Sequence, residues 1–308
     1  MIKLRTLLLL VPFFALFSCS DDESNGPGHN TSPITADCKL SSYSYVESYD
    51  SSSINLLRYE EAKTYTYNED KLISYLDEAT LSGLDSAGDR QESSQSFLFE
   101  FEYSGTELVS ILNNDREILG IRNVDGRPYI IFAESTSGGL IEFVLEYDGQ
   151  NRLQYIYNRE DEGDDIASIP HYEIVYGTDG DIAEFSQVAS NGTKELINDF
   201  NYNDTMKNPY QGFVFFLLSI FETSFENDGI FFADASKLSP GITESYRLSI
   251  YNVNTERYER FNFAGEYSED MTYTTNVNNY PKTGSMSFNI TAGIVASINE
   301  SYSYTNCD

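Results

Sequence analysis

Short segments in which apolar and polar residues alternate dominate the chain from about residue 43 onward. The clearest is 96–103 (SFLFEFEY), where aromatic residues occupy every second position and Leu98, Glu100 and Glu102 lie between them. A period of two is typical of a strand that buries one face. Long helical periodicity is scarce, so the pattern predicts a mainly β fold. Further strands are expected at 141–147, 172–176, 246–253 and 285–290, each bounded by Gly, Asn or Asp turns.

A degenerate repeat links several of these segments. Residues 65–75 (YTYNEDKLISY) match 101–111 (FEYSGTELVSI) position for position in residue type. Each unit reads as a hairpin, because an aromatic strand end is followed by Asn, Asp or Gly, which accept left-handed turn conformations, and then by a returning apolar strand. Successive hairpins predict an antiparallel meander, either a single curved sheet or a soluble barrel-like β-domain. Looser copies of the unit lie at 147–155, 176–182 and 200–204.

The chain changes character after Pro209. Residues 212–221 (GFVFFLLSIF) are strongly apolar but too few to span a bilayer. We expect a short buried helix or plug near 212–223 that covers the apolar face of the sheet, with a partner-docking or ligand-lining segment as the alternative. The sequence thus predicts a single all-β domain over 37–308, with hairpin repeats at about 43–205, C-terminal strands at about 243–305 and a turn at 279–284.

The N-terminus follows a different pattern. Lys3 and Arg5 precede an apolar run at 7–17, which leads into Ser18 and Cys19. A transmembrane helix needs roughly twenty apolar residues, whereas a shorter run matches the core of a secretory signal. The segment resembles a bacterial lipoprotein signal peptide over residues 1–18. This resemblance implies that Cys19 becomes the first mature residue and carries the lipid.

An acidic cluster directly follows that cysteine. Ser20, Asp21, Asp22 and Glu23 look like the surface-export signal of Bacteroidetes-type lipoproteins. The resemblance implies a lipid anchor in the outer membrane and a domain that faces the cell exterior. Residues 19–36 are rich in Ser, Asp, Asn, Gly and Pro, a composition typical of a flexible tether between anchor and domain.

The hairpin repeats and the segment that ends them carry a further resemblance. The chain is similar, over about residues 40–305, to a family of Bacteroidetes lipoproteins of unknown function with a porin-like fold. Repeats in that family end in an Asp-x-x-x-Asn-Pro-aromatic break, which Asp204, Asn208, Pro209 and Tyr210 match. The units also look like shorter, degenerate copies of the tyrosine-aspartate repeats of large secreted shell proteins. The family has no established activity, so no catalytic residue is implied.

Charge limits the possible partners. The chain has 49 acidic and 19 basic residues, a net charge of −30. Such a surface repels phosphate backbones and anionic headgroups, so nucleic acid is excluded as a partner. The polar positions of the best predicted strands are Glu, Ser and Asp, which disfavours strands that face lipid. The membrane is therefore expected to be contacted through the lipid anchor only.

Two cysteines remain once Cys19 is assigned to lipid. Cys38 and Cys307 lie at opposite ends of the predicted domain. In an exported protein they are expected to form a disulfide, with two free thiols as the alternative. No cluster with ligand spacing accompanies them, so we predict no metal site and no cofactor. The acidic run 160–165 lacks the alternating order of a calcium loop and is interpreted as a solvated hairpin tip.

Catalytic motifs are missing from the sequence. His171 is the one histidine of the predicted domain, and no nucleophile elbow, phosphate loop or zinc helix accompanies it. We therefore expect a non-catalytic domain that binds a glycan or a protein partner through Tyr and Phe on the concave side of the sheet. The alternatives are an envelope structural component and a surface hydrolase. A hydrolase would need two carboxylates about 5–10 Å apart in a β cleft.

Overall fold

The computed structural model describes residues 38–51, 54–84, 88–134, 140–159, 169–224, 235–239, 241–252, 255, 257–264, 271–291 and 294–307. Several predicted features lie outside these residues, namely the signal peptide, Cys19, the export signal, the tether and the run 160–165. The strands are β1 (Lys39–Ser51), β2 (Ile54–Asn68), β3 (Lys71–Leu84), β4 (Arg90–Ser104), β5 (Glu107–Asn113), β6 (Arg116–Val124), β7 (Arg127–Glu134), β8 (Leu140–Tyr147), β9 (Leu153–Arg159), β10 (Tyr172–Tyr176), β11 (Ile182–Val188), β12 (Lys194–Lys207), β13 (Gly241–Asn252), β14 (Arg257–Ala264), β15 (Thr272–Thr275), β16 (Pro281–Thr291) and β17 (Ile294–Thr305). The helices are α1 (Phe213–Ser224) and the short 3-10 helix η1 (Ala235–Leu238).

The strands form one antiparallel meander. From β1 to β14 each strand pairs with the next along the chain. Strands β15, β16 and β17 extend the sheet on the other side, where β17 pairs with β1. Among the described residues no pairing joins β14 to β15, so the sheet is curved but not closed. The prediction of a mainly β fold with a single curved meander is confirmed.

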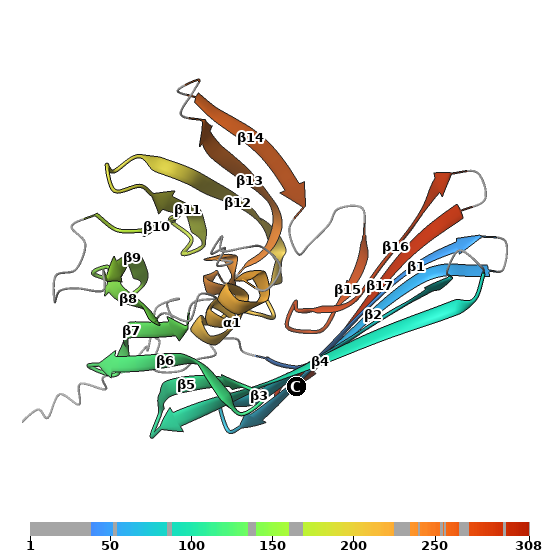
Figure 1. Ribbon diagram of the computed structural model, residues 1–308, viewed down its shortest axis with the longest axis horizontal. Coiled ribbons are helices and arrows are strands. Elements are labelled where there is room, and N and C mark those ends of the chain that lie inside the picture. Colours follow the sequence, from blue (N-terminus) through green and yellow to red (C-terminus); the bar gives the residue numbers. More distant parts are fainter. Residues whose placement is uncertain are drawn as a thin grey trace, which may run out of the picture.

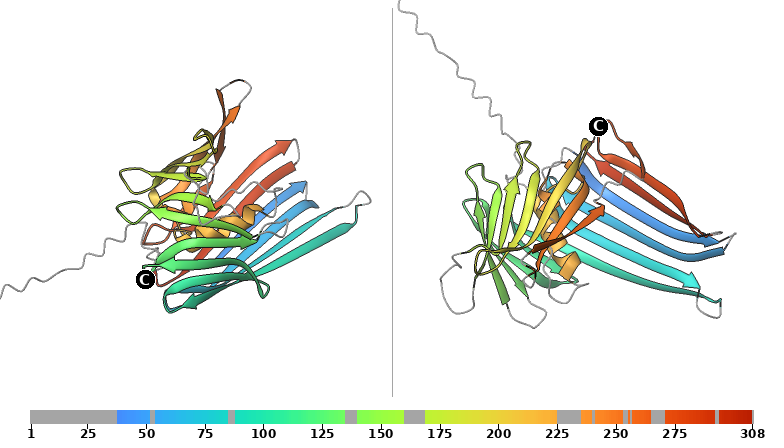
Figure 2. Two further views of the ribbon diagram at one scale, coloured as in Figure 1. Left: turned by 60° about the vertical axis from the view of Figure 1, so that its left-hand side comes forward. Right: turned by 90° about the horizontal axis from the view of Figure 1, so that it is seen from above.

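The sheet has a short-stranded half and a long-stranded half. Strands β5 to β11 have five to nine residues each, whereas β2 and β4 have fifteen. At about 3.3 Å per residue, fifteen residues extend for about 50 Å. Figure 1 shows the short strands curling around α1 while β1 to β4, β16 and β17 project beyond it, and Figure 2 shows the same projection from two further directions. We call these projecting strand ends the arm.

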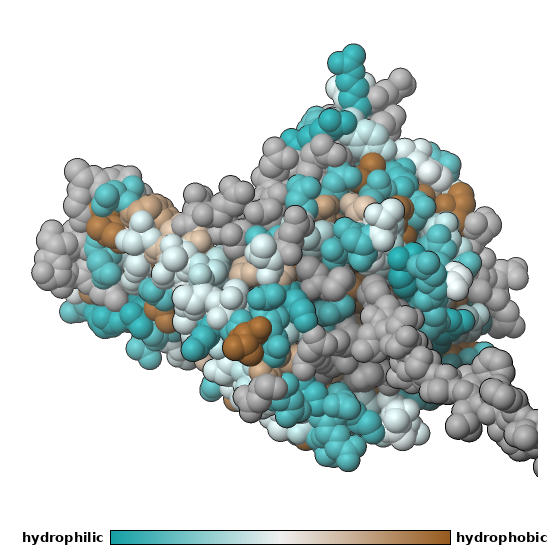
Figure 3. Space-filling view, turned by 180° about the vertical axis from the view of Figure 1, so that it is seen from behind, coloured by the Kyte–Doolittle hydropathy of each residue, from teal (hydrophilic) through white to brown (hydrophobic). Residues whose placement is uncertain are grey.

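Seen from behind, the molecule presents a mainly hydrophilic face with scattered hydrophobic patches (Figure 3). On one face of the arm, hydroxyl side chains of neighbouring strands pair with each other. The Oγ atoms of Ser44 and Ser301 lie 2.7 Å apart, and those of Ser48 and Ser297 are at the same distance. Small hydroxyl side chains therefore satisfy one another across the strands on this face.

Hydrogen bonds between successive hairpins explain the tyrosine repeat. A tyrosine hydroxyl in each unit donates to a backbone carbonyl near the start of the strand that precedes its own. In four units the residue just before that carbonyl is Lys or Arg, and its cation lies over the same tyrosine ring, an attractive cation–π arrangement. These bonds join Tyr67 to Leu40, Tyr103 to Leu72, Tyr147 to Pro128 and Tyr176 to Leu153, under Lys39, Lys71, Arg127 and Arg152.

Tyr176 offers a direct test of this repeat contact. Its hydroxyl donates to the Leu153 carbonyl at 2.9 Å, and burial raises the pKa of the phenol, so it stays a neutral donor. Replacing Tyr176 with Phe should lower the free energy of unfolding by about 1–2 kcal/mol, because it leaves a partly buried carbonyl without its donor. Urea unfolding measures the change. The same substitution at exposed Tyr129 is the control, and equal losses in both variants would contradict the role of the contact.

The predicted turn at 279–284 is wrong. Pro281 already begins β16, and the turn lies a few residues earlier. The Oδ1 atom of Asn276 accepts from the backbone N–H groups of Asn278 and Tyr280, each at 3.0 Å, and Asn279 adopts a left-handed φ of 67°. This side-chain bonding of Asn to the backbone fixes the turn at 276–280, so the Pro-Lys-Thr-Gly segment is free to pair as a strand.

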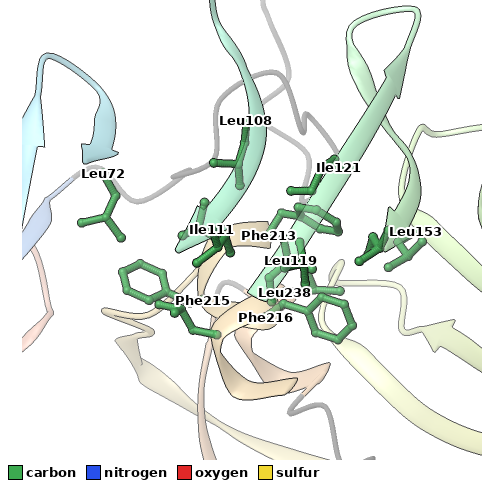
Figure 4. Close-up of a cluster of buried hydrophobic side chains, with 14 of the residues drawn as sticks. Leu72, Leu108, Ile111, Leu119, Ile121, Leu153, Phe213, Phe215, Phe216 and Leu238 are labelled. Carbon is green, nitrogen blue, oxygen red and sulfur yellow. The ribbon is translucent and has the colours of Figure 1, made fainter. Parts of the chain in front are cut away.

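Helix α1 fills the concave side of the short-stranded half. Its residues 213–218 are all buried, which confirms the short apolar helix expected near 212–223. Figure 4 shows Phe213 and Phe216 on the side of Leu119 and Leu153, with Phe215 on the opposite side of the helix. A helix that is apolar all round suits a site enclosed by sheet. In the described part of the chain, no helix has both the length and the apolar character required to cross a membrane.

The Asn-Pro-aromatic break holds α1 in place. Asn208 is fully buried, accepts from the backbone N–H of Tyr210 at 2.9 Å and donates to the carbonyl of Ser239 at 3.2 Å. The Ser239 hydroxyl in turn accepts from the N–H of Ile182 at 2.8 Å and donates to the Tyr202 hydroxyl at 2.8 Å. Each of these polar groups is satisfied inside the core, so the break, η1 and the sheet form one connected unit.

Cys38 and Cys307 are joined by a disulfide, with Cα atoms 4.8 Å apart. It links the residue before β1 to the end of the chain after β17, two strands that already pair. The side chains of Asn276 and Asn278 lie against it, and Asn278 donates to the Cys307 carbonyl at 2.9 Å. These contacts also fix the turn between β15 and β16 against the disulfide.

Candidate functional site

A pocket of about 280 Å³ lies on the concave face where the arm meets the short-stranded half. Strands β1, β2, β3 and β17 form one wall, and α1 and η1 contribute Phe215, Leu218 and Lys237. The helix is thus a wall of the pocket and does not fill it. Most of the lining is aromatic, from Tyr43, Tyr65, Tyr75, Tyr210, Phe215 and Tyr302.

Strand register brings residues distant in sequence to this face. Tyr43 of β1 lies opposite Lys63 of β2 on one side and Tyr302 of β17 on the other. Tyr45, two positions further, lies opposite Glu61 and Glu300 in the same two strands. Directly opposed residues of antiparallel strands point to the same face, so alternate positions of three strands converge on the pocket.

The aromatic rings of the pocket hold one another in position. Tyr65 and Tyr75 stack with ring centroids 5.0 Å apart, and Phe215 meets Tyr65 edge-on at 5.7 Å. Tyr210 meets Phe215 at 5.8 Å, and Tyr43 lies 5.1 Å from Tyr302. Both stacked and edge-on arrangements are favourable geometries for aromatic pairs. The rings are therefore held in fixed orientations before any ligand arrives.

Glu300 is the central polar group. Its carboxylate accepts from the hydroxyl of Tyr302 at 3.0 Å and from that of Tyr43 at 3.3 Å, and Tyr273 also hydrogen-bonds to it. Glycine at 284 makes room for this arrangement, because a Cβ there would lie 2.9 Å from the carboxylate and 2.8 Å from the Tyr273 ring. Burial raises the pKa of Glu300, although the tyrosine donors oppose the shift.

The raised pKa of Glu300 predicts a pH effect on stability. The folded state holds the proton of the Glu300 carboxyl group more tightly than the unfolded state, in which its pKa is the ordinary 4.5. The protonated group therefore stabilises the fold at low pH. Its contribution is lost as pH rises from 4.5 through the raised folded pKa. Stability of the wild-type protein relative to Glu300→Gln should therefore fall as pH rises across that window. Urea midpoints over a pH series measure it, with Glu92→Gln as an exposed control; a constant difference would contradict the assignment.

Charges of both signs accompany Glu300 in the pocket. The Lys63 ammonium lies 3.4 Å from a carboxylate oxygen of Glu61 and 3.8 Å from one of Asp77. Lys237 lies 4.4 Å from the centroid of the Tyr210 ring. The pocket is thus neither strongly anionic nor strongly cationic. Across the described ranges, no group of three or more His, Cys, Asp or Glu could hold a metal ion.

Comparison with known proteins adds a fold likeness alone. No protein-family model matches the sequence, and no curated protein matches it. Among solved structures, the chain is similar to the crystal structure of a porin-like protein from Bacteroides uniformis ATCC 8492. The two share 12% sequence identity with a TM-score of 0.49, over 86% of this chain and 96% of that one.

Of the residues singled out from sequence, Tyr210 lines the pocket and the others named here lie elsewhere. The Cys38–Cys307 disulfide is at the end of the sheet, while Cys19 and the export signal fall outside the described residues. His171 packs edge-on against Tyr172 with ring centroids 4.5 Å apart, and burial lowers its pKa. It does not line the pocket.

Sequence reasoning named Tyr210 and the segment 212–221, which supplies Phe215 and Leu218 to the pocket, but it missed the pocket residues of the strands. The alternation Tyr43-Ser-Tyr45 and Ser-Tyr302-Ser-Tyr304 was a usable signal, since it places tyrosines on one face of two strands. The alternation itself does not reveal that these two strands pair, and the predicted Cys38–Cys307 disulfide is the sequence feature that brings their ends together.

Proposed function

We propose that this domain is a non-catalytic binding module whose pocket takes an uncharged glycan. The observation that supports this proposal is that rigidly held tyrosine rings, carboxylate groups and ammonium groups surround one pocket. Rigid rings offer flat apolar surfaces, and charged donors and acceptors converge to fix orientation, the usual composition of a small-molecule site. A hydroxyl-rich neutral ligand can use both the carboxylates and the ammonium groups. An anion would meet Glu61 and Glu300, and a cation would meet Lys63 and Lys237.

A protein partner fits this pocket less well. Specific protein interfaces cover about 800 Å² on each partner and centre on surfaces open enough for close packing. Tyr65, Tyr75 and Tyr302 are instead buried and reached only through the recess. A small ligand or the end of a chain is the occupant that matches this shape.

The proposal is tested by screening the purified domain against an array of neutral and charged glycans, followed by calorimetry on each hit. Tyr302→Ala and Tyr43→Ala should weaken binding of a neutral glycan about tenfold or more, since each removes a ring from the pocket. Tyr129→Ala, at an exposed position outside the pocket, is the matched control. Absence of any neutral-glycan hit, or hits unaffected by the pocket variants, would overturn the proposal.

We also propose that Cys19 is lipidated and that the domain is displayed on the outer face of the outer membrane. Support comes from the signal-peptide resemblance and from the acidic cluster at 20–23. A lipid-modified cysteine followed by a tether places a binding domain at a membrane without a spanning segment. Metabolic labelling with an alkyne fatty acid should mark the wild-type protein and not Cys19→Ala. Protease treatment of intact cells should remove the domain, and protection from protease would contradict surface display.

A second candidate function, hydrolysis of the bound glycan, rests on Glu61 and Glu300. Both carboxylates line the pocket and lie opposite Tyr45 on its two neighbouring strands, so their backbones are about 10 Å apart. Glu300, with its raised pKa, would protonate the leaving oxygen while Glu61 takes a proton from the attacking water. A reducing-end assay on each bound glycan tests this. No turnover would remove the hydrolase, as would turnover that survives in Glu300→Gln.

A further inference from the structure

A strip of aromatic and apolar side chains continues from the pocket along the arm. Tyr45 and Tyr49 of β1, Tyr59 and Leu57 of β2, and Leu81 of β3 form this tyrosine strip. Their register places them on one face: Tyr49 lies opposite Leu57, and Tyr59 lies opposite Leu81. Tyr45 lies opposite the pocket residues Glu61 and Glu300, so the strip and the pocket share a face and are continuous.

The strip is accessible to a ligand. Leu57 is 39% exposed and Leu81 is 47% exposed, although both point to the concave face that α1 covers elsewhere. Figure 1 shows the arm projecting past the helix, which accounts for this exposure. The other face of the same strands carries the paired serines, Ser44 with Ser301 and Ser48 with Ser297. Exposed Leu84 and Val295 also lie on this serine face, so the strip is distinguished by its tyrosines and by its continuity with the pocket.

Glu47 orders the tyrosines of the strip. Its two carboxylate oxygens accept from the hydroxyls of Tyr45, at 3.0 Å, and of Tyr49. The rings of Tyr45 and Tyr59 pack edge-on with centroids 6.0 Å apart. Rings held in place by such contacts lose little conformational entropy when a ligand binds, which is the advantage of preorganisation.

The dimensions of the strip identify its occupant. From Tyr45 to Tyr49 the strand advances about 13 Å, or about 20 Å when the pocket residue Tyr43 is included, and three neighbouring strands are about 15 Å wide, which gives roughly 200–300 Å². A protein partner needs about 800 Å² on its own side, which is more than the strip provides even with exposed Phe97 of β4 and Phe288 of β16 on the same face. An extended chain molecule that lies parallel to the strands can contact the strip along its whole length and covers only part of its width. The net charge of −30 disfavours an anionic chain.

We propose that the tyrosine strip binds the body of an extended, uncharged glycan chain whose terminal unit occupies the pocket. This inference rests on the proposed function and goes beyond it in assigning chain length as the recognised property. The pocket then selects the end of the chain, and Tyr45, Tyr49 and Tyr59 supply successive ring surfaces for the units behind it.

The test uses neutral oligosaccharide series, from monosaccharide to hexasaccharide, of gluco-, manno-, xylo- and galacto-configured chains, measured by calorimetry on the domain. Affinity for the recognised series should rise about tenfold or more from the shortest to the longest member. Tyr49→Ala and Tyr59→Ala should remove that rise and leave the monosaccharide affinity unchanged. Thermal unfolding establishes that each variant is folded, and Tyr129→Ala serves as the matched control.

The outcomes separate the two proposals. Monosaccharide binding that depends on Tyr302 but does not strengthen with chain length would overturn the role of the strip and leave the pocket proposal standing. A rise with chain length that persists in both strip variants would also overturn the inference. No binding by any member of the series would overturn both. Capture of a peptide in place of a glycan by the strip would contradict the assigned occupant.

Discussion

Replacing Phe216 with alanine should destabilise the protein by about 3–5 kcal/mol. Phe216 is 0% exposed and lies in the first turn of α1, with its ring centroid 6.0 Å from that of Phe213. Truncation removes the transfer free energy of the ring and leaves a cavity, because the surrounding sheet is held by its own hydrogen bonds and relaxes little. Guanidinium unfolding monitored by tyrosine fluorescence gives the change in the free energy of unfolding.

The matched control for this core substitution is Phe288→Ala. Phe288 is 45% exposed on β16, so its truncation should cost much less than that of Phe216. A variant at Phe216 that unfolds at the wild-type midpoint would show that α1 is not an integral part of the core. The pocket wall would then depend on the sheet alone.

Reduction of the Cys38–Cys307 disulfide should lower stability by about 2–5 kcal/mol. The two cysteines are 269 residues apart, so the bond restricts the unfolded chain over nearly the whole domain. Thermal unfolding with and without a thiol reductant measures the loss in the wild-type protein. The double variant Cys38→Ser/Cys307→Ser should show the lower midpoint in both conditions.

A reductant effect that persists in the double serine variant would be unrelated to this bond and would contradict the prediction, as would an unchanged midpoint in the wild-type protein. The contacts of Asn276 and Asn278 with the sulfur atoms predict a local effect as well. Amide hydrogen exchange in the 276–280 turn should accelerate on reduction, because the turn loses its support.

Local sequence patterns predicted much of the fold. Alternation at 96–103 corresponds to part of β4, where Phe99 and Phe101 are buried as the pattern requires. Phe97 follows the same alternation and yet is 37% exposed, because at that point the strand enters the arm and leaves the cover of α1. Periodicity reports which face a residue shares with its neighbours, and it contains no information on what lies opposite that face.

The pocket depended on contacts that no local pattern encodes. Tyr43 and Glu300 are 257 residues apart and meet only because β17 returns to pair with β1. The repeat units could be recognised from their turn residues, whereas the bond from each tyrosine to the previous hairpin could not, since it lies between units. Strand pairing at long sequence separation is fixed by the assembled sheet, and hairpin chemistry specifies only neighbouring pairs.

The disulfide has a mechanical consequence. Because Cys38 and Cys307 are bonded, a pull on the chain ahead of residue 38 is carried into both β1 and β17 at once. Strand β1 lies inside the sheet and is hydrogen-bonded along its length to β2 and β17. Hydrogen bonds of antiparallel strands run perpendicular to the strands, so force along β1 loads two ladders together in shear and does not peel them apart one bond at a time. The domain is thus built to stay folded under tension applied through the chain that precedes β1.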